Sequence, residues 1–236
     1  LFHERRMDIP RTKEDVIQEQ LGLGGSIIEV QKINGSWKWI ENSPWNRRIS
    51  ARTFIPFQKC YKIMGATQAM GTVANCAGGL TPWGTILTCE ENYEMFYGDV
   101  TYRNKQRKFI EDNRLKWYEF FPLPPEHYGW VVEVNPFTGA AVKRNALGRF
   151  SHEAATVTLS RNNKAVVYMG EDVRGGFIFK FISDSGTSLE KGTLYAADTV
   201  HGRWIALDLN KTPQLRKYFN SQQDVLTYAH FAAEYA

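Results

Sequence analysis

The 236-residue sequence is 43% hydrophobic and 23% charged, which is the composition of a folded globular protein and excludes a disordered chain. Its formal net charge is +4, and its Lys and Arg residues are spread among Asp and Glu rather than gathered in one stripe, so we expect no nucleic-acid partner. No apolar run approaches the roughly 20 residues that a membrane-spanning helix needs.

The first residue and the cysteines bear on where the protein works. The chain begins with Leu1 rather than an initiator Met, so we expect it to be an internal piece of a longer polypeptide whose export signal would precede it. The cysteines are Cys60, Cys76 and Cys89, and they form neither a CxxC pair nor a zinc-binding spacing. An odd number argues against a closed disulfide framework, so one of the three calls for a separate explanation.

Residues 11–20 predict a helix with Thr12 as its N-cap, and short β patterns follow it. The dipeptide Asn34-Gly35 is a strong hairpin signal, and comparable tight turns recur along the chain. The last residues, 221–236, predict a helix that begins near Ser221. The grouped strand ranges are 26–30 with 37–40, 130–134 with 140–143, 154–159 with 165–169 and 176–182, and 192–197 with 203–209.

Many short strands joined by tight turns are typical of a sandwich, a barrel or a propeller. Three strands in close succession followed by a fresh hairpin favour propeller blades, which run to about 40–50 residues each, so that the chain would hold about four or five. The sequence therefore predicts an all-β fold, a partial β-propeller with short helical insertions, in one domain spanning 1–236. The polar segment 98–127, with its basic cluster at 103–108, predicts a solvated insertion loop on the rim.

Acidic residues stand at the ends of three predicted strands. If 85–91 is a strand, Cys89 and Glu91 share one face and Glu90 takes the other. Glu153 leads a second strand, and Asp172 lies in the turn after a third. In a propeller such points converge at one mouth of the central channel. Clustered carboxylates need compensating cations, and a thiolate among them adds a ligand for a softer transition metal.

Each of these positions also has a simpler structural interpretation. A cysteine in an apolar strand, such as Cys89, is usually a small buried hydrophobe. Acidic pairs at strand ends are usually solvated turns or surface ion pairs. His152 points away from the face of Glu153 and is expected to be structural. The recurrence of carboxylates at the same point of successive β units favours the metal-site hypothesis over these alternatives.

Several segments resemble the signature of the PhoX-type alkaline phosphatases, and they occur in the family's order over nearly the whole chain. The most specific is the run TPWGTILTCEEN at 81–92, which follows Asn-Cys-Ala-Gly-Gly at 75–79. The other matching segments are 148–155 (GRFSHEAA), 168–181 (YMGEDVRGGFIFKF), 25–30 (GSIIEV), 46–49 (NRRI) and the dipeptide at 3–4 (HE).

The resemblance implies a six-bladed β-propeller that hydrolyses phosphomonoesters at a mixed site of ferric iron and calcium. By the matching motifs, Cys89 would be the iron-bound thiolate, with Glu153 and Asp172 as further metal ligands. We add Glu91 from the face that it is expected to share with Cys89. Glu4 is a candidate for a calcium position by its place in the family's Asn-His-Glu motif.

The chain departs from the family pattern at two points. Glu171 stands where the family usually has Asp, which keeps the charge but lengthens the side chain. The chain also ends at Ala236, where the family continues to an Asp-Arg-Pro-Glu motif that supplies a phosphate-clamping Arg and another carboxylate. Members are usually exported folded by the twin-arginine route, which implies a periplasmic or secreted protein. We expect a monomer acting on small phosphate esters, active as the full-length enzyme and incomplete as this piece alone.

The chemistry implied by the resemblance belongs mainly to the metals, which polarise the phosphoryl oxygens and lower the pKa of a bound water. A covalent mechanism with Cys89 as nucleophile is a rival. It is disfavoured because no His is placed to activate the thiol and because nearby carboxylates would raise its pKa. A non-catalytic alternative also stands: a calcium-stabilised propeller module or an inactive fragment.

Overall fold

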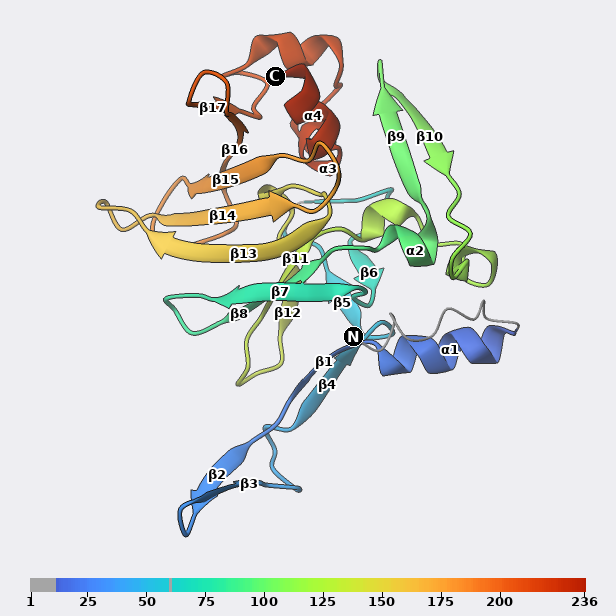
Figure 1. Ribbon diagram of the computed structural model, residues 1–236, viewed down its shortest axis with the longest axis vertical. Helices are drawn as coiled ribbons and strands as arrows, with labels where there is room; N and C mark the ends of the chain where they lie inside the picture. The colour runs from blue at the N-terminus through green and yellow to red at the C-terminus, as the bar shows by residue number, and fades with distance from the viewer. Residues whose placement is uncertain (1–11, 60) are drawn as a thin grey trace.

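The computed structural model describes residues 12–59 and 61–236, and most of its regular structure is β (Figure 1). Two large antiparallel sheets dominate. One has the strand order β12-β11-β8-β7, and the other has the order β13-β14-β15-β16-β17. The bounds of their strands are β7 (Asn75–Leu80), β8 (Ile86–Glu90), β11 (Val131–Val134), β12 (Ala141–Lys143), β13 (His152–Leu159), β14 (Ala165–Glu171), β15 (Ile178–Ser183), β16 (Gly192–Asp198) and β17 (Arg203–Ala206).

The two sheets meet edge to edge through β7 and β13, which lie side by side in Figure 1. This close approach depends on glycine. A Cβ atom on Gly79 would lie 2.3 Å from the backbone oxygen of Ala155 on β13, and one on Gly78 would lie 1.8 Å from the oxygen of Leu87 on β8. Any larger residue at either position would force the strands apart.

The remaining strands form two-stranded ribbons. The predicted hairpin at Asn34-Gly35 is confirmed, because both residues adopt the positive φ angles, 51° and 82°, that this tight turn requires. It joins strands that continue the β1–β4 ribbon outward in Figure 1. The bounds of the ribbon strands are β1 (Gly24–Ile27) with β4 (Arg47–Ser50), β2 (Val30–Ile33) with β3 (Ser36–Trp39), β5 (Phe54–Pro56) with β6 (Gln68–Met70), and β9 (Asp99–Arg103) with β10 (Gln106–Ile110).

The helices at both ends of the described chain begin where the sequence predicts. Thr12 caps α1 (Lys13–Gly22) with a capping box completed by Asp15, and Ser221 caps α3 (Gln222–Thr227) in the same way with Asp224. The C-terminal helix breaks at Tyr228 and continues as α4 (Ala229–Tyr235). The short helices between them are α2 (Glu94–Tyr97), η2 (Trp117–Glu119), η3 (Pro125–His127), η4 (Asn145–Leu147) and η5 (Pro213–Lys217).

Two expectations about the sheets are corrected. Residues 192–198 and 203–206 do not start a new blade but continue the five-stranded sheet as β16 and β17. Within the described residues only two sheets have four or more strands, so complete blades are fewer than the four or five expected. No helix of this part of the chain is long and apolar enough to cross a membrane.

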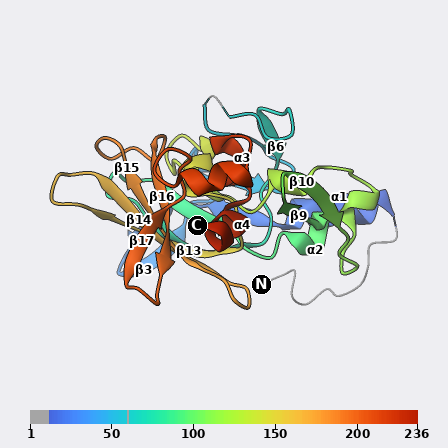
Figure 2. The same ribbon diagram turned by 90° about the horizontal axis from the view of Figure 1, so that it is seen from above.

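The segment 98–127 is more ordered than a solvated loop. It contains the β9–β10 hairpin, in which Arg103 pairs with Glu234 at 2.8 Å and Arg107 pairs with the buried Glu126 at 2.5 Å. Figures 1 and 2 show α4 between this hairpin and the five-stranded sheet. The ion pairs therefore attach the hairpin to the main body of the protein, and its position on a propeller rim stays a prediction.

Candidate metal-binding site

The three carboxylates that the sequence singles out come from three different segments. Glu91 follows directly after β8, Glu153 is the second residue of β13 and projects outward at an irregularity of the strand pairing, and Asp172 follows β14. Backbone contacts join these segments. The amide of Asp172 donates to the carbonyl oxygen of Ser151 at 3.0 Å, and the Ser151 hydroxyl donates to the carbonyl oxygen of Glu91 at 2.8 Å.

The side chain of Glu91 shows that these carboxylates interact. Burial is the main reason that the pKa of Glu91 lies above its usual value, and a side-chain hydrogen bond with Asp172 raises it further. The negative charges of Asp172 and Glu153 act in the same direction. Glu153 and Asp172, which follow Glu91 by 62 and 81 residues in the sequence, are thus near Glu91 in space. The convergence of Glu91, Glu153 and Asp172 on one metal site stays a prediction.

Cys76 lies next to this cluster, in β7, and its thiol is exposed. The Glu91 side chain lies near enough to affect the pKa of the Cys76 thiol. Desolvation raises the pKa of the Cys76 thiol above its usual value, and Glu91 and Glu153 raise it further. A bound metal ion would instead lower the pKa of the Cys76 thiol, because a metal-coordinated thiol is deprotonated. Cys76 therefore has the position relative to the carboxylates that the sequence analysis expected of Cys89.

The structure does not place Cys89 beside Glu91 on a shared face. Strand β8 ends at Glu90, so the alternation of side chains does not extend to Glu91. The Cys89 thiol has no exposed surface and lies in the apolar core with Leu87 and Val131. Burial raises the pKa of this thiol far above its usual range. Cys89 is thus buried as a small hydrophobe would be, and its role as the iron-bound thiolate stays a prediction.

Glu90 belongs to the structural core and not to the cluster. Both its side chain and that of Lys143 are fully buried, and the two form an ion pair at 2.7 Å. Glu90 also accepts hydrogen bonds from the amides of Trp130 at 3.0 Å and Val73 at 3.3 Å. His152 is structural as well, since it is fully buried and burial lowers its pKa to about 3. The opposite orientation of His152 and the outward-projecting Glu153 matches the expectation from strand alternation.

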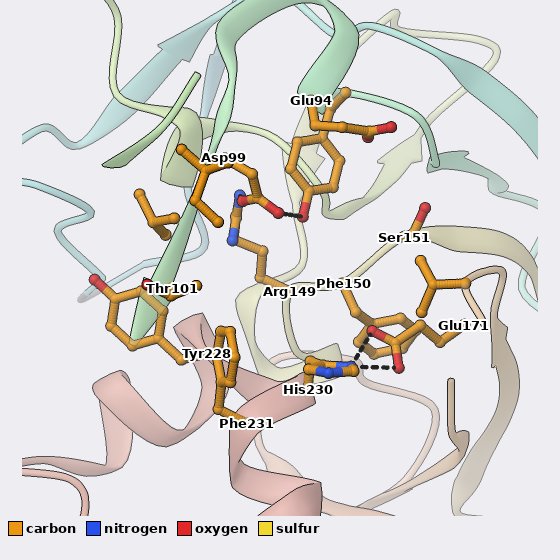
Figure 3. Close-up of a pocket in the computed structure, with 14 residues that line it drawn as sticks. Glu94, Asp99, Thr101, Arg149, Phe150, Ser151, Glu171, Tyr228, His230 and Phe231 are labelled. Carbon is orange, nitrogen blue, oxygen red and sulfur yellow. Dashed lines mark hydrogen bonds and ion pairs between the residues drawn. The ribbon is translucent and has the colours of Figure 1, made fainter. Parts of the chain in front are cut away.

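A cavity of about 310 Å³ lies on the other side of Ser151 and Glu171 (Figure 3). Its floor carries a buried cation, Arg149, which bonds Asp99 at 2.7 Å and lies over the ring of Tyr93. On the opposite wall, Figure 3 shows the imidazole of His230 pointing at the carboxylate of Glu171, with the Nδ1 atom 3.0 Å from both oxygens. That hydrogen bond raises the pKa of His230.

Sequence reasoning passed over Arg149, His230 and Cys76 as site residues. Arg149 and Cys76 both stand inside segments that resemble the family signature, which was the available signal. His230 carried no such signal, because it reaches Glu171 only through the docking of α4 against the turn after β14.

The chemistry of the Cys76–Glu91–Glu153–Asp172 cluster fits metal ions. Carboxylate oxygens are the preferred ligands of calcium, and thiolate suits a transition metal. Desolvation is the main cause of the raised pKa values of Glu91 and Cys76, and the neighbouring negative charges add to it. A bound cation would relieve the repulsion between these charges. Across residues 12–59 and 61–236, no three His, Cys, Asp or Glu side chains already converge on one point as ligands. Glu4, the further calcium candidate, lies outside the described residues, as does Cys60.

Comparisons with known proteins agree with the fold and the motifs. The family model described as alkaline phosphatase PhoX matches residues 3–236. The structure of Pseudomonas fluorescens PhoX in complex with vanadate, a transition-state analogue, is similar, with 32% sequence identity and a TM-score of 0.76. The match covers 96% of this chain and 47% of that one, so the chain spans about half the length of the solved relative. No curated protein sequence matches. The likeness confirms the predicted β-propeller fold, and the chain belongs to the PhoX alkaline phosphatase family.

Proposed function

We propose that the protein hydrolyses phosphomonoesters at a site built from Cys76, Glu91, Glu153 and Asp172, with ferric iron and calcium as its metals. The observation that carries this proposal is the interaction of Glu91 with the other three side chains in a chain of the PhoX family. Glu4 remains a proposed calcium ligand. For the thiol ligand we propose Cys76 in place of Cys89, because Cys76 is exposed and its pKa is raised by Glu91 and Glu153, whereas Cys89 is buried.

The residues would divide the work by their chemistry. Glu91, Glu153 and Asp172 offer hard oxygen ligands, and the exposed Cys76 offers a thiolate for the softer metal. The metals supply charge stabilisation of the phosphoryl oxygens and an acidic bound water. The protein holds the donors in place and keeps Cys89 out of the chemistry. A covalent role for Cys89 is opposed by its complete burial and raised pKa.

The substrate class follows from the family and from the solved relative. Pseudomonas fluorescens PhoX binds vanadate, described as a transition-state analogue, which supports small phosphate esters as substrates of the present protein. We propose a periplasmic or secreted monomer, in line with the export of family members. A generic aryl phosphate at alkaline pH is the substrate with which to test the activity.

The test is turnover of that aryl phosphate by the natural polypeptide that contains this chain, before and after dialysis against a calcium chelator. We expect activity to be lost on dialysis and to return when calcium is added. Undiminished turnover without calcium would contradict the mixed-metal site. Calcium binding with no turnover by the untreated protein would favour the non-catalytic propeller module instead.

A further inference from the structure

The three carboxylates of the cluster lie on separate segments and repel one another. Before any cation binds, other contacts must hold these segments in place. Glu91, Glu153 and Asp172 belong to the end of β8, the start of β13 and the turn after β14. Coulomb repulsion favours their separation. Contacts that do not involve the carboxylates must therefore fix the three segments.

Ser151 makes contacts of this kind with two of the segments and belongs to the third. Its hydroxyl donates to the backbone oxygen of Glu91 at 2.8 Å, and its backbone oxygen accepts the amide of Asp172 at 3.0 Å. Glu153 is only two residues further along its own chain segment. Ser151 is 7% exposed, so water does not compete freely for these bonds.

Hydrogen bonds hold the backbone of Glu91 at both its carbonyl and its amide. The carbonyl accepts from the Ser151 hydroxyl, and the amide donates to the backbone oxygen of Ala74 at 3.1 Å, two residues before Cys76. The Glu91 residue is thus held through its N–H by the Cys76 segment and through its C=O by Ser151. Because Glu91 has just left strand β8, no ladder hydrogen bond replaces the Ser151 contact.

We propose that Ser151 is a positioning residue for the metal site: it sets Glu91 and Asp172 relative to Glu153 so that the cations meet a preformed ligand set. The inference rests on the proposed function, because it assigns Ser151 a part in the same site. In this role Ser151 is not itself a metal ligand. Its effect passes through the backbone of the ligand residues, as is general for groups that orient metal ligands.

The test compares Ser151→Ala with Ser151→Thr, which keeps the hydroxyl, and with a matched control, Ser183→Ala. Ser183 is equally buried, at 1% exposure, and its hydroxyl also donates to a backbone oxygen, that of Ser185 at 3.0 Å, but in β15. Calcium binding to the natural polypeptide is measured by titration calorimetry. Amide hydrogen exchange is measured on the same proteins without calcium.

We expect Ser151→Ala to weaken calcium binding by about 10- to 100-fold, the range typical for loss of a ligand-orienting contact, while KM for an aryl phosphate at saturating calcium changes little. Without calcium, the amide of Glu91 should exchange at least ~10-fold faster, since the Glu91 carbonyl loses the contact that holds it. The amide of Asp172 keeps its bond to the Ser151 backbone oxygen and should change less. Ser151→Thr should restore both properties, and Ser183→Ala should change neither.

Calcium affinity and exchange rates like those of the wild type in Ser151→Ala would overturn the inference, as would an equal effect in Ser183→Ala. The exchange readout needs no metal and no turnover. If the wild type neither binds calcium nor hydrolyses the ester, the proposed function fails. Unchanged exchange at Glu91 in Ser151→Ala would then separately refute the positioning role.

Discussion

Glu90 and Glu91 are adjacent carboxylates with opposite structural roles, so the same substitution at each should have opposite effects on stability. Glu90 is fully buried and pairs with the equally buried Lys143 at 2.7 Å. It accepts two backbone amides besides, from Trp130 and Val73. Glu91 is only half-buried, and its pKa is raised by burial and by its acidic neighbours. Glu90→Gln and Glu91→Gln make the same chemical change, from carboxylate to amide, at adjacent positions.

The expected loss of unfolding free energy in Glu90→Gln follows from the buried ion pair of Glu90 with Lys143. Removing one partner of such a pair costs about 3–5 kcal/mol, because the other charge stays buried without compensation. The amide of Gln can still accept from Trp130 or Val73, which places the expected loss near ~3 kcal/mol, a large part of a typical total of roughly 5–15 kcal/mol. Glu91→Gln removes a carboxylate whose charged form the fold disfavours, so the metal-free protein should keep its stability or gain slightly.

Loss of Glu90 should also make stability depend on pH. Burial lowers the pKa of Lys143, and the Glu90 charge opposes that shift. Without Glu90 the folded-state pKa falls further below the unfolded value, so the folded protein binds fewer protons between the two values. Stability of Glu90→Gln should therefore rise as pH rises through this window and fall as pH drops through it.

The assay is urea denaturation of the chelator-treated protein, followed by tryptophan fluorescence at two pH values. A loss below ~1 kcal/mol in Glu90→Gln, or an equal loss in Glu91→Gln, would refute the assignment of Glu90 to the core and Glu91 to the site. Lys143→Met removes the buried charge that Glu90→Gln leaves without a partner. Combining the two substitutions should therefore recover part of the unfolding free energy lost in Glu90→Gln.

Three further predictions concern the site and its support. Glu153→Gln and Asp172→Asn should each abolish phosphatase activity while the circular dichroism spectrum stays unchanged; near wild-type rates in both would make them surface carboxylates. The His230–Glu171 bond raises the pKa of His230, so its contribution to stability should be full below about pH 6.5 and be lost as pH rises through the folded pKa, and thermal melts of His230→Gln should lack this step. Gly79→Ala should destabilise the sheet junction by roughly 1–3 kcal/mol in urea melts, whereas the unobstructed Gly25→Ala should not; equal melts would show that β7 and β13 can separate freely.

Local signals predicted the local structure well. Thr12 and Ser221 mark the starts of their helices because a side-chain oxygen close to unpaired amides is sufficient to cap them. Asn34-Gly35 specifies its hairpin because both residues tolerate positive φ. The β9–β10 hairpin was missed because its turn residues are Asn104 and Lys105, and a lysine at φ 63° gives no such signal.

The site residues stay a prediction. Glu153 and Asp172 were chosen from the matching family motifs and because carboxylates recur at the ends of successive strands. Cys89 was chosen over Cys76 from the matching family signature and from strand alternation continued to Glu91, whereas β8 ends at Glu90. On β7 the pairing is irregular between Asn75 and Gly78, so no regular alternation could have indicated where Cys76 points.

The most direct test of the proposed site is the visible spectrum and iron content of the purified natural polypeptide, compared between Cys76→Ser and Cys89→Ala. A thiolate bound to ferric iron gives an intense charge-transfer band, so the wild type should be coloured. Cys76→Ser should lose the band and much of its iron, because Cys76 is the thiol whose pKa Glu91 raises. Cys89→Ala should keep both, since the Cys89 thiol is buried in the apolar core. A band that survives in Cys76→Ser and disappears in Cys89→Ala would contradict the site described above.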